Sequence, residues 1–76
     1  MRTYCIIDSS EVSSIDFNEI LETSEKSLKY SLDGTKVVVK YEGAQPSFLD
    51  GKTEYSHSEI LTILAGPDWT GPNINP

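Results

Sequence analysis

His57 is the residue of this 76-residue chain whose chemistry most invites a catalytic role. Histidine titrates near neutral pH and can carry a proton. His57, however, follows Ser56 at the expected start of a helix, where an exposed polar side chain is common and the helix dipole disfavours protonation. We interpret His57 as a surface or capping residue, because a lone histidine lacks the partners that acid–base catalysis requires.

Cys5 lies in an apolar run beside Ile6 and Ile7, which favours a packed thiol over a reactive one. With one cysteine and one histidine, the chain can form neither an internal disulfide nor a structural zinc site. Such cysteine use is typical of a reducing compartment, and no stretch reaches the roughly 18 apolar residues of a membrane span. We therefore expect a cytoplasmic protein that does not bind membranes.

The other polar residues show no spacing typical of an active site or a cofactor site. No serine lies in a Gly-x-Ser-x-Gly elbow, and the glycines are isolated, so the phosphate-binding loop motifs are absent. Acid pairs such as Asp8 with Glu11 lack the Asp-rich loop of an EF-hand and are expected to be solvated. The sequence therefore predicts a protein that is not an enzyme and uses no cofactor or metal.

The charge distribution bears on the kind of partner. Twelve acids and six bases give a net charge of −6, which disfavours nucleic acid, because a polyanion is attracted to clustered cations. Only the middle of the chain is locally basic, through Lys29, Lys36 and Lys40. We expect these lysines to lie on the solvent side of a sheet, where they discourage edge pairing.

Residues 27–41 predict a β-hairpin. Apolar and polar residues alternate over 27–32, Asp33-Gly34 suits a two-residue type I′ turn, and the returning run 35–41 is rich in β-branched and aromatic residues. This closure places Tyr30 opposite Val37 and makes one face of the hairpin apolar.

The same register places Leu28 opposite Val39 on the apolar face. The other face would carry the three lysines together with Val38, which is therefore expected to face solvent.

The segment before the hairpin is less regular. Residues 3–7 predict a short strand, and residues 8–10 a turn. Residues 12–22 are compatible with a strand or a helix, since they carry an apolar face at either period and a weak capping box. We favour a strand, which a connection at residues 23–26 would join to the hairpin as a meander over residues 12–41.

The clearest helix signal covers residues 57–65. Ser56 and Glu59 form a capping box, and Gly66 is placed for a left-handed C-cap before Pro67, which stops the helix. Tyr55 and Ile60 are expected to form a hydrophobic staple. The expected buried face of the helix consists of Ile60, Leu61, Ile63 and Leu64.

The remaining aromatic residues supply candidates for an interface. In the loop 44–52, Phe48 and Leu49 are expected to fold back over the edge of the core. Trp69 is expected to plug the end of a thin core, with an interface role as the alternative. The candidates for a protein interface are Trp69, Tyr55, Phe48 and Val38.

Together these elements predict an α+β fold, in which a small antiparallel sheet of three to four strands, arranged as a meander, is packed by one C-terminal helix. Residues 1–70 would form a single domain, and residues 71–76 a flexible C-terminal tail. A chain of this size buries only about 60% of its unfolded surface, so a homo-oligomer would add stability.

Five segments of the chain resemble small uncharacterised proteins of tailed phages that infect marine cyanobacteria: LETS at 21–24, SLDGTK at 31–36, VKYEG at 39–43, YSHSEIL at 55–61 and PDWT at 67–70. The resemblance covers most of the chain. It implies a phage protein that acts in the cytoplasm of the bacterial host, and it carries over no catalytic residue.

The leading functional hypothesis is a non-enzymatic protein-interaction module, a phage accessory protein that binds a protein partner of unknown identity. Its binding surface would be either its acidic surface or an aromatic patch around Trp69. A structural or self-assembling subunit is the alternative. A further alternative is an acidic mimic of DNA that blocks a DNA-binding protein.

Overall fold

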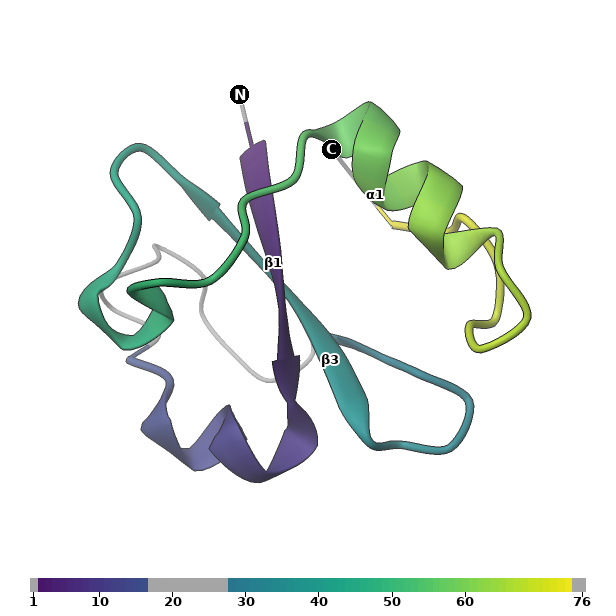
Figure 1. The fold of residues 1–76 in the computed structure, drawn as a ribbon, viewed down its shortest axis with the longest axis horizontal. Helices are drawn as coiled ribbons and strands as arrows, with labels where there is room; N and C mark the ends of the chain where they lie inside the picture. The colour runs from purple at the N-terminus through teal and green to yellow at the C-terminus, as the bar shows by residue number, and fades with distance from the viewer. Residues whose placement is uncertain (1, 17–27, 75–76) are drawn as a thin grey trace.

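A computed structural model describes residues 2–16 and 28–74 of the chain. Three strands form one open antiparallel sheet, and a helix packs on it (Figure 1), which confirms the predicted α+β class. No helix in these two ranges has the length and apolar character needed to cross a bilayer. In chain order the elements are β1 (Arg2–Asp8), the 3₁₀ helix η1 (Ser9–Ser14), β2 (Lys29–Tyr30), β3 (Lys36–Glu42), the 3₁₀ helix η3 (Ser47–Leu49) and α1 (His57–Leu64).

β3 is the central strand of the sheet, as its run of β-branched residues favours. β1 pairs with it along its whole length and ends with Asp8 opposite Lys36, while Tyr30 of β2 lies opposite Val37 on the other side. The register between Tyr30 and Val37 is the one that the sequence predicts. The strand order is β1-β3-β2, so the described strands do not follow the sequential order of a meander.

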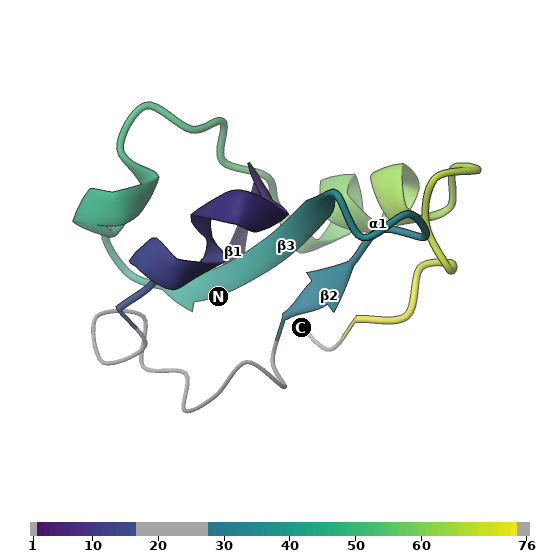
Figure 2. The same cartoon turned by 90° about the horizontal axis from the view of Figure 1, so that it is seen from below.

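α1 covers the face of the sheet that carries Val38 (Figure 2). Val38 has no exposed surface and packs with Tyr4 of β1 and with Ile60 and Leu64 of α1; we call these four residues the helix-side cluster. The expectation that Val38 lies on a solvent-facing side of the hairpin is therefore wrong. The lysines flank this face, and the helix covers its apolar centre.

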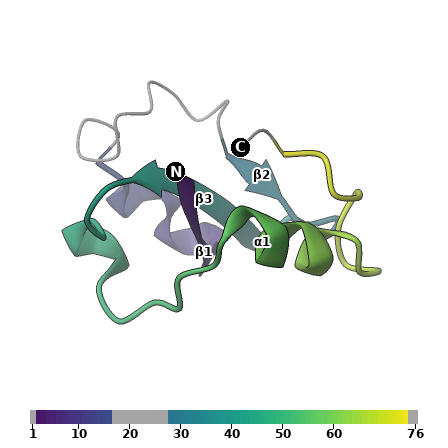
Figure 3. The ribbon, with the colours of Figure 1, turned by 90° about the horizontal axis from the view of Figure 1, so that it is seen from above.

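The other face of the sheet is covered by short 3₁₀ helices and loops instead of an α-helix (Figure 3). η1 and η3 pack here, on the side of the sheet away from α1, and the buried residues from this region are Ile15, which directly follows η1, and Leu49 of η3. Phe48 packs against the same cluster, so both members of the predicted fold-back at residues 48 and 49 contact the core. The buried residues of this face, called the η-side cluster, are Cys5, Ile7, Ile15, Val37, Val39, Tyr41 and Leu49.

The two outer edges of the sheet differ. The chain between η3 and α1 crosses β1, where Tyr4 N–H donates to Tyr55 C=O at 2.9 Å and Tyr55 N–H donates to Tyr4 C=O at 2.7 Å. This single bridge adds one residue of backbone pairing to the outer edge of β1. β2, at the opposite edge, is only two residues long.

The start of α1 is the predicted one. Glu59 N–H donates to Ser56 Oγ at 3.2 Å, and Ser56 N–H donates to the Glu59 carboxylate at 2.9 Å, which completes the capping box. Its end differs from the prediction, because Gly66 does not adopt the left-handed conformation. Gly66 N–H instead donates to Ile63 C=O at 3.0 Å, so the last turn tightens to an i→i−3 bond. Leu61 is half-buried and belongs to neither cluster.

η1 replaces the turn and the beginning of the strand that the sequence predicts. Residues 12–14 belong to this 3₁₀ helix, so the predicted strand over 12–22 is wrong for residues 12–16, and residues 17–22 lie outside the described ranges. Asp8 N–H donates to the Glu11 carboxylate at 3.0 Å. This bond ties down the first turn of η1 and competes with an extended chain.

The described part of the predicted tail packs on the domain. Ile74 contacts the helix-side cluster, and its carbonyl oxygen lies 3.3 Å from His57 Nε2. Lys29 Nζ donates to Thr70 Oγ1 at 2.9 Å and to Asn73 C=O at 3.3 Å. These contacts place residues 70–74 beside β2, and residues 75–76 lie outside the description.

Candidate functional site

The turn between β2 and β3 is the best-defined polar feature of the surface. Gly34 N–H donates to Ser31 C=O at 3.0 Å, so Leu32 and Asp33 are the central residues of this turn. Ser31 N–H donates to Lys36 C=O at 2.9 Å and closes a four-residue loop. The predicted two-residue turn centred on Asp33-Gly34 is therefore wrong, although the register of the strands is unchanged.

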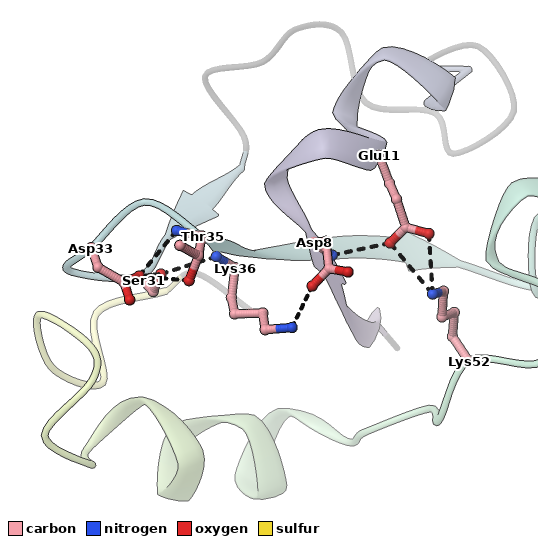
Figure 4. A network of polar contacts seen from close by, with 7 residues as sticks. All are labelled: Asp8, Glu11, Ser31, Asp33, Thr35, Lys36 and Lys52. Carbon is pink, nitrogen blue, oxygen red and sulfur yellow. Dashed lines mark hydrogen bonds and ion pairs between the residues drawn. The ribbon is translucent and has the colours of Figure 1, made fainter.

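The carboxylate of Asp33 holds this loop together (Figure 4). Its Oδ1 accepts from Ser31 Oγ at 2.8 Å, from Thr35 N–H at 3.0 Å and from Thr35 Oγ1 at 2.7 Å. The Ser31 hydroxyl oxygen accepts in turn from Lys36 N–H at 3.1 Å. Side chains that bond to nearby backbone groups in this way fix the conformation of a turn.

We predict that acid weakens the protein partly through Asp33. Hydrogen bonds from the Thr35 backbone, then from the Thr35 and Ser31 side chains, lower the pKa of Asp33 to about 2. The unfolded chain takes up this proton at higher pH than the folded one, so the stabilisation is complete above about pH 4 and is lost as the pH falls towards 2. Urea unfolding at pH 4 and at pH 2.5 measures the loss.

Asp33→Asn is the control for this prediction, because it removes the titrating group and leaves the other carboxylates in place. Lys36 lowers the pKa of Asp8, and the Ser56 backbone N–H lowers the pKa of Glu59. These two groups contribute to the acid sensitivity of the wild type and of the variant alike. The loss of unfolding free energy between pH 4 and 2.5 is expected to be smaller in the variant. An equal loss in both proteins would contradict a role for Asp33.

The fixed turn presents an apolar surface. Leu32 is 63% exposed and Tyr30 is 41% exposed, and they are the two large hydrophobic residues with high exposure in the described part of the chain. They lie two residues apart, one at the end of β2 and one in the turn. We call Tyr30 and Leu32 the hairpin-tip surface.

Three contacts anchor this surface to the body of the protein. Leu32 N–H donates to Asp68 C=O at 2.9 Å, and Ser9 N–H donates to Thr35 C=O at 2.8 Å. Lys36 forms an ion pair with Asp8 (Figure 4). The hairpin tip is therefore held both by the segment after α1 and by the start of η1.

The residues proposed from the sequence as an interface are used in packing. Val38 is fully buried, as described above, and is not available at the surface. Trp69 and Tyr55 are half-buried against the helix-side cluster, and Phe48 is half-buried against the η-side cluster. The structure therefore distributes these four residues over two faces of the sheet and does not bring them together.

The buried thiol of Cys5, in the η-side cluster, has polar neighbours. Its Sγ is 3.6 Å from Tyr41 Oη and 3.7 Å from Gln45 Nε2, and Tyr41 Oη donates a short hydrogen bond to the Glu54 carboxylate. Burial raises the pKa of Cys5, and burial with the Glu54 contact raises the pKa of Tyr41. Both groups are protonated at neutral pH, so the thiol is packed and lacks the thiolate character of a nucleophile.

His57 is half-buried at the start of α1, with its ring centroid 5.8 Å from that of Tyr4. Its other contact is with Ile74, so it links the helix to the C-terminal segment. In residues 2–16 and 28–74, no three histidine, cysteine or acidic side chains gather as a metal site would require. Glu11 is instead paired with Lys52, whose Nζ lies 3.3 Å from Oε1 (Figure 4).

Sequence reasoning missed the hairpin-tip surface because strict alternation assigned Tyr30 and Leu32 to a buried face. The signal that identifies the loop is the set of hydroxyl residues around Asp33: Ser31 two positions before it and Thr35 two positions after it. These favour an aspartate-centred loop that includes Leu32.

The case for a functional role of this surface rests on the structure alone. Comparison of the chain with protein-family models, with curated proteins and with solved structures finds no significant match.

Proposed function

We propose that the protein is a non-enzymatic interaction module that binds another protein through the hairpin-tip surface. The observation that carries the proposal is the 63% exposure of Leu32 on a turn whose conformation Asp33 holds in place. An exposed apolar side chain on a fixed loop favours binding, because burial removes apolar surface from water and little conformational freedom remains to be lost.

The resemblance to cyanobacterial phage proteins supports a setting for this function. We propose an accessory protein of a tailed phage, which acts in the host cytoplasm on a host or phage protein. The net charge of −6 favours a basic partner surface and increases the association rate at low salt.

Site-specific crosslinking tests this function. A photo-reactive phenylalanine analogue replaces Leu32 in one version of the protein and Asp50 in another, and each is irradiated in cyanobacterial lysate. Asp50 is exposed and directly follows η3. The η3 segment lies far from the loop between β2 and β3 in all views (Figures 1 to 3). We expect a discrete crosslinked protein from position 32 that is absent from position 50.

Two results would contradict the proposal. Identical crosslinking from both positions would show that the hairpin tip has no special role, and so would the absence of any crosslinked species. A product that contains only this chain, together with a dimer in sedimentation, would favour the self-assembling subunit instead.

A further inference from the structure

The outer edge of β2 has backbone groups that point away from the sheet. Ser31 N–H donates to Lys36 C=O on the β3 side, while the next residue, Leu32, donates its N–H to Asp68 C=O on the other side. Successive residues of an antiparallel strand direct their N–H and C=O groups to opposite edges. Tyr30 therefore directs both of its backbone groups to the outer edge, like Leu32.

The neighbouring segment makes no backbone hydrogen bond to this part of the edge. Residues 68–74 run beside β2 (Figures 2 and 3), but they join it through the Leu32 bond and through the side chain of Lys29. No backbone hydrogen bond links Tyr30 N–H or C=O to residues 2–16 or 28–74 outside the β2–β3 pairing. This backbone position, unpaired within the described residues, lies beside the exposed Tyr30 and Leu32 side chains.

The charges around the outer edge of β2 select the kind of segment that fits it. Asp33 and Asp68 are both exposed, and they lie next to Leu32 in the sequence and across its hydrogen bond. The ammonium group of Lys29 is occupied by Thr70 and Asn73. A second copy of this chain would bring a further charge of −6, so charge complementarity favours a basic segment of a different protein.

We propose that the outer edge of β2 accepts an extended basic segment of a partner protein, which pairs with the backbone of Tyr30 as an added strand. Apolar side chains of that segment pack on Tyr30 and Leu32, and lysine or arginine side chains lie beside Asp33 and Asp68. Strand addition of this kind takes its affinity from main-chain hydrogen bonds and its specificity from alternate side chains. The proposal rests on the proposed function and names its binding mode and the chemistry of its partner.

Peptide selection followed by hydrogen exchange tests the binding mode. A yeast-displayed library of random twelve-residue peptides is selected against the immobilised protein, and the best peptide is synthesised. We expect selected peptides that alternate apolar residues with lysine or arginine. In the free protein, the Tyr30 amide is expected to exchange faster than those of Ser31 and Leu32, and the peptide should slow it by about tenfold or more.

Matched variants test the charge and the backbone pairing. Asp68→Lys is expected to weaken peptide binding by about fivefold or more, whereas Asp50→Lys, with the same change of charge at the far end of the molecule, should have a much smaller effect. Methylation of the peptide backbone at every second nitrogen should abolish binding in one register and spare it in the other.

The outcomes separate this inference from the proposed function. Peptides that leave the Tyr30 amide unprotected, that lack basic residues, or that tolerate methylation in both registers would overturn strand addition, and so would a selection that yields no binder. If crosslinking from position 32 still captures a partner, the interaction module survives and only its binding mode is wrong. If that crosslinking also fails, the proposed function fails with it.

Discussion

Val38→Lys is expected to lower the free energy of unfolding by about 3–5 kcal/mol. Val38 has no exposed surface and packs between β1 and α1, so the substitution puts an amine against Tyr4, Ile60 and Leu64. An uncompensated buried charge costs about 3–5 kcal/mol. A domain of this length has a total unfolding free energy of roughly 4–11 kcal/mol, so this cost is a large part of it.

Urea unfolding followed by far-ultraviolet circular dichroism measures the effect. Leu32→Lys is the matched control, because it introduces the same group at a side chain that is 63% exposed. It is expected to change the unfolding free energy by less than about 0.5 kcal/mol. Native-like stability of Val38→Lys would show that the helix does not cover this face.

Leu49→Ala is expected to lower the unfolding free energy by about 2–5 kcal/mol. Leu49 lies in η3, a single turn of 3₁₀ helix, yet it has no exposed surface and belongs to the η-side cluster. The alanine leaves a cavity under a loop that has little regular structure with which to close it. The loss should match that of Ile60→Ala, which removes an equally buried residue of α1.

Asp50→Ala provides the neighbouring control. Asp50 is exposed and directly follows Leu49, so its truncation changes the same loop without changing the core, and the expected effect is within about 0.5 kcal/mol. Equal effects at positions 49 and 50 would mean that the loop does not form part of the core. All four proteins are compared by urea unfolding at one pH.

The parts of the fold that the sequence predicted correctly depend on local interactions. The start of α1 follows from Ser56 and Glu59, whose bonds span three residues, and the register between Tyr30 and Val37 follows from a short loop. Such signals need no knowledge of the rest of the chain, because both partners are close in sequence.

Local signals in the sequence did not predict which face of the sheet α1 covers. Val37, Val38 and Val39 are all apolar, so alternation does not say which face the helix takes and which the irregular segments take. Which face the helix covers depends on the bridge between Tyr55 and Tyr4, where the chain before α1 crosses β1. These two residues are far apart in the sequence. The strand expected from residue 12 failed for a different, local reason, because the bond between Asp8 N–H and the Glu11 carboxylate favours a 3₁₀ turn.

The candidate site was only partly accessible from the sequence. Large aromatic residues such as Trp69 and Phe48 are common interface anchors, but a thin core also needs the apolar area that they bury. In the structure, both pack against the sheet. Leu32 reaches the surface because it occupies the turn, which depends on the bonds of Asp33 more than on hydrophobicity. The exposure of Leu32 therefore follows from the hydrogen bonds that fix the loop.

The unequal edges of the sheet have a consequence for stoichiometry. Fibrils grow edge to edge and need two free edges on every subunit, since each strand must accept a neighbour on both sides. In this protein the backbone of Tyr55 already occupies the outer edge of β1 at Tyr4. Pairing along that edge is interrupted at this residue, which favours a one-to-one complex at the other edge over an open-ended polymer.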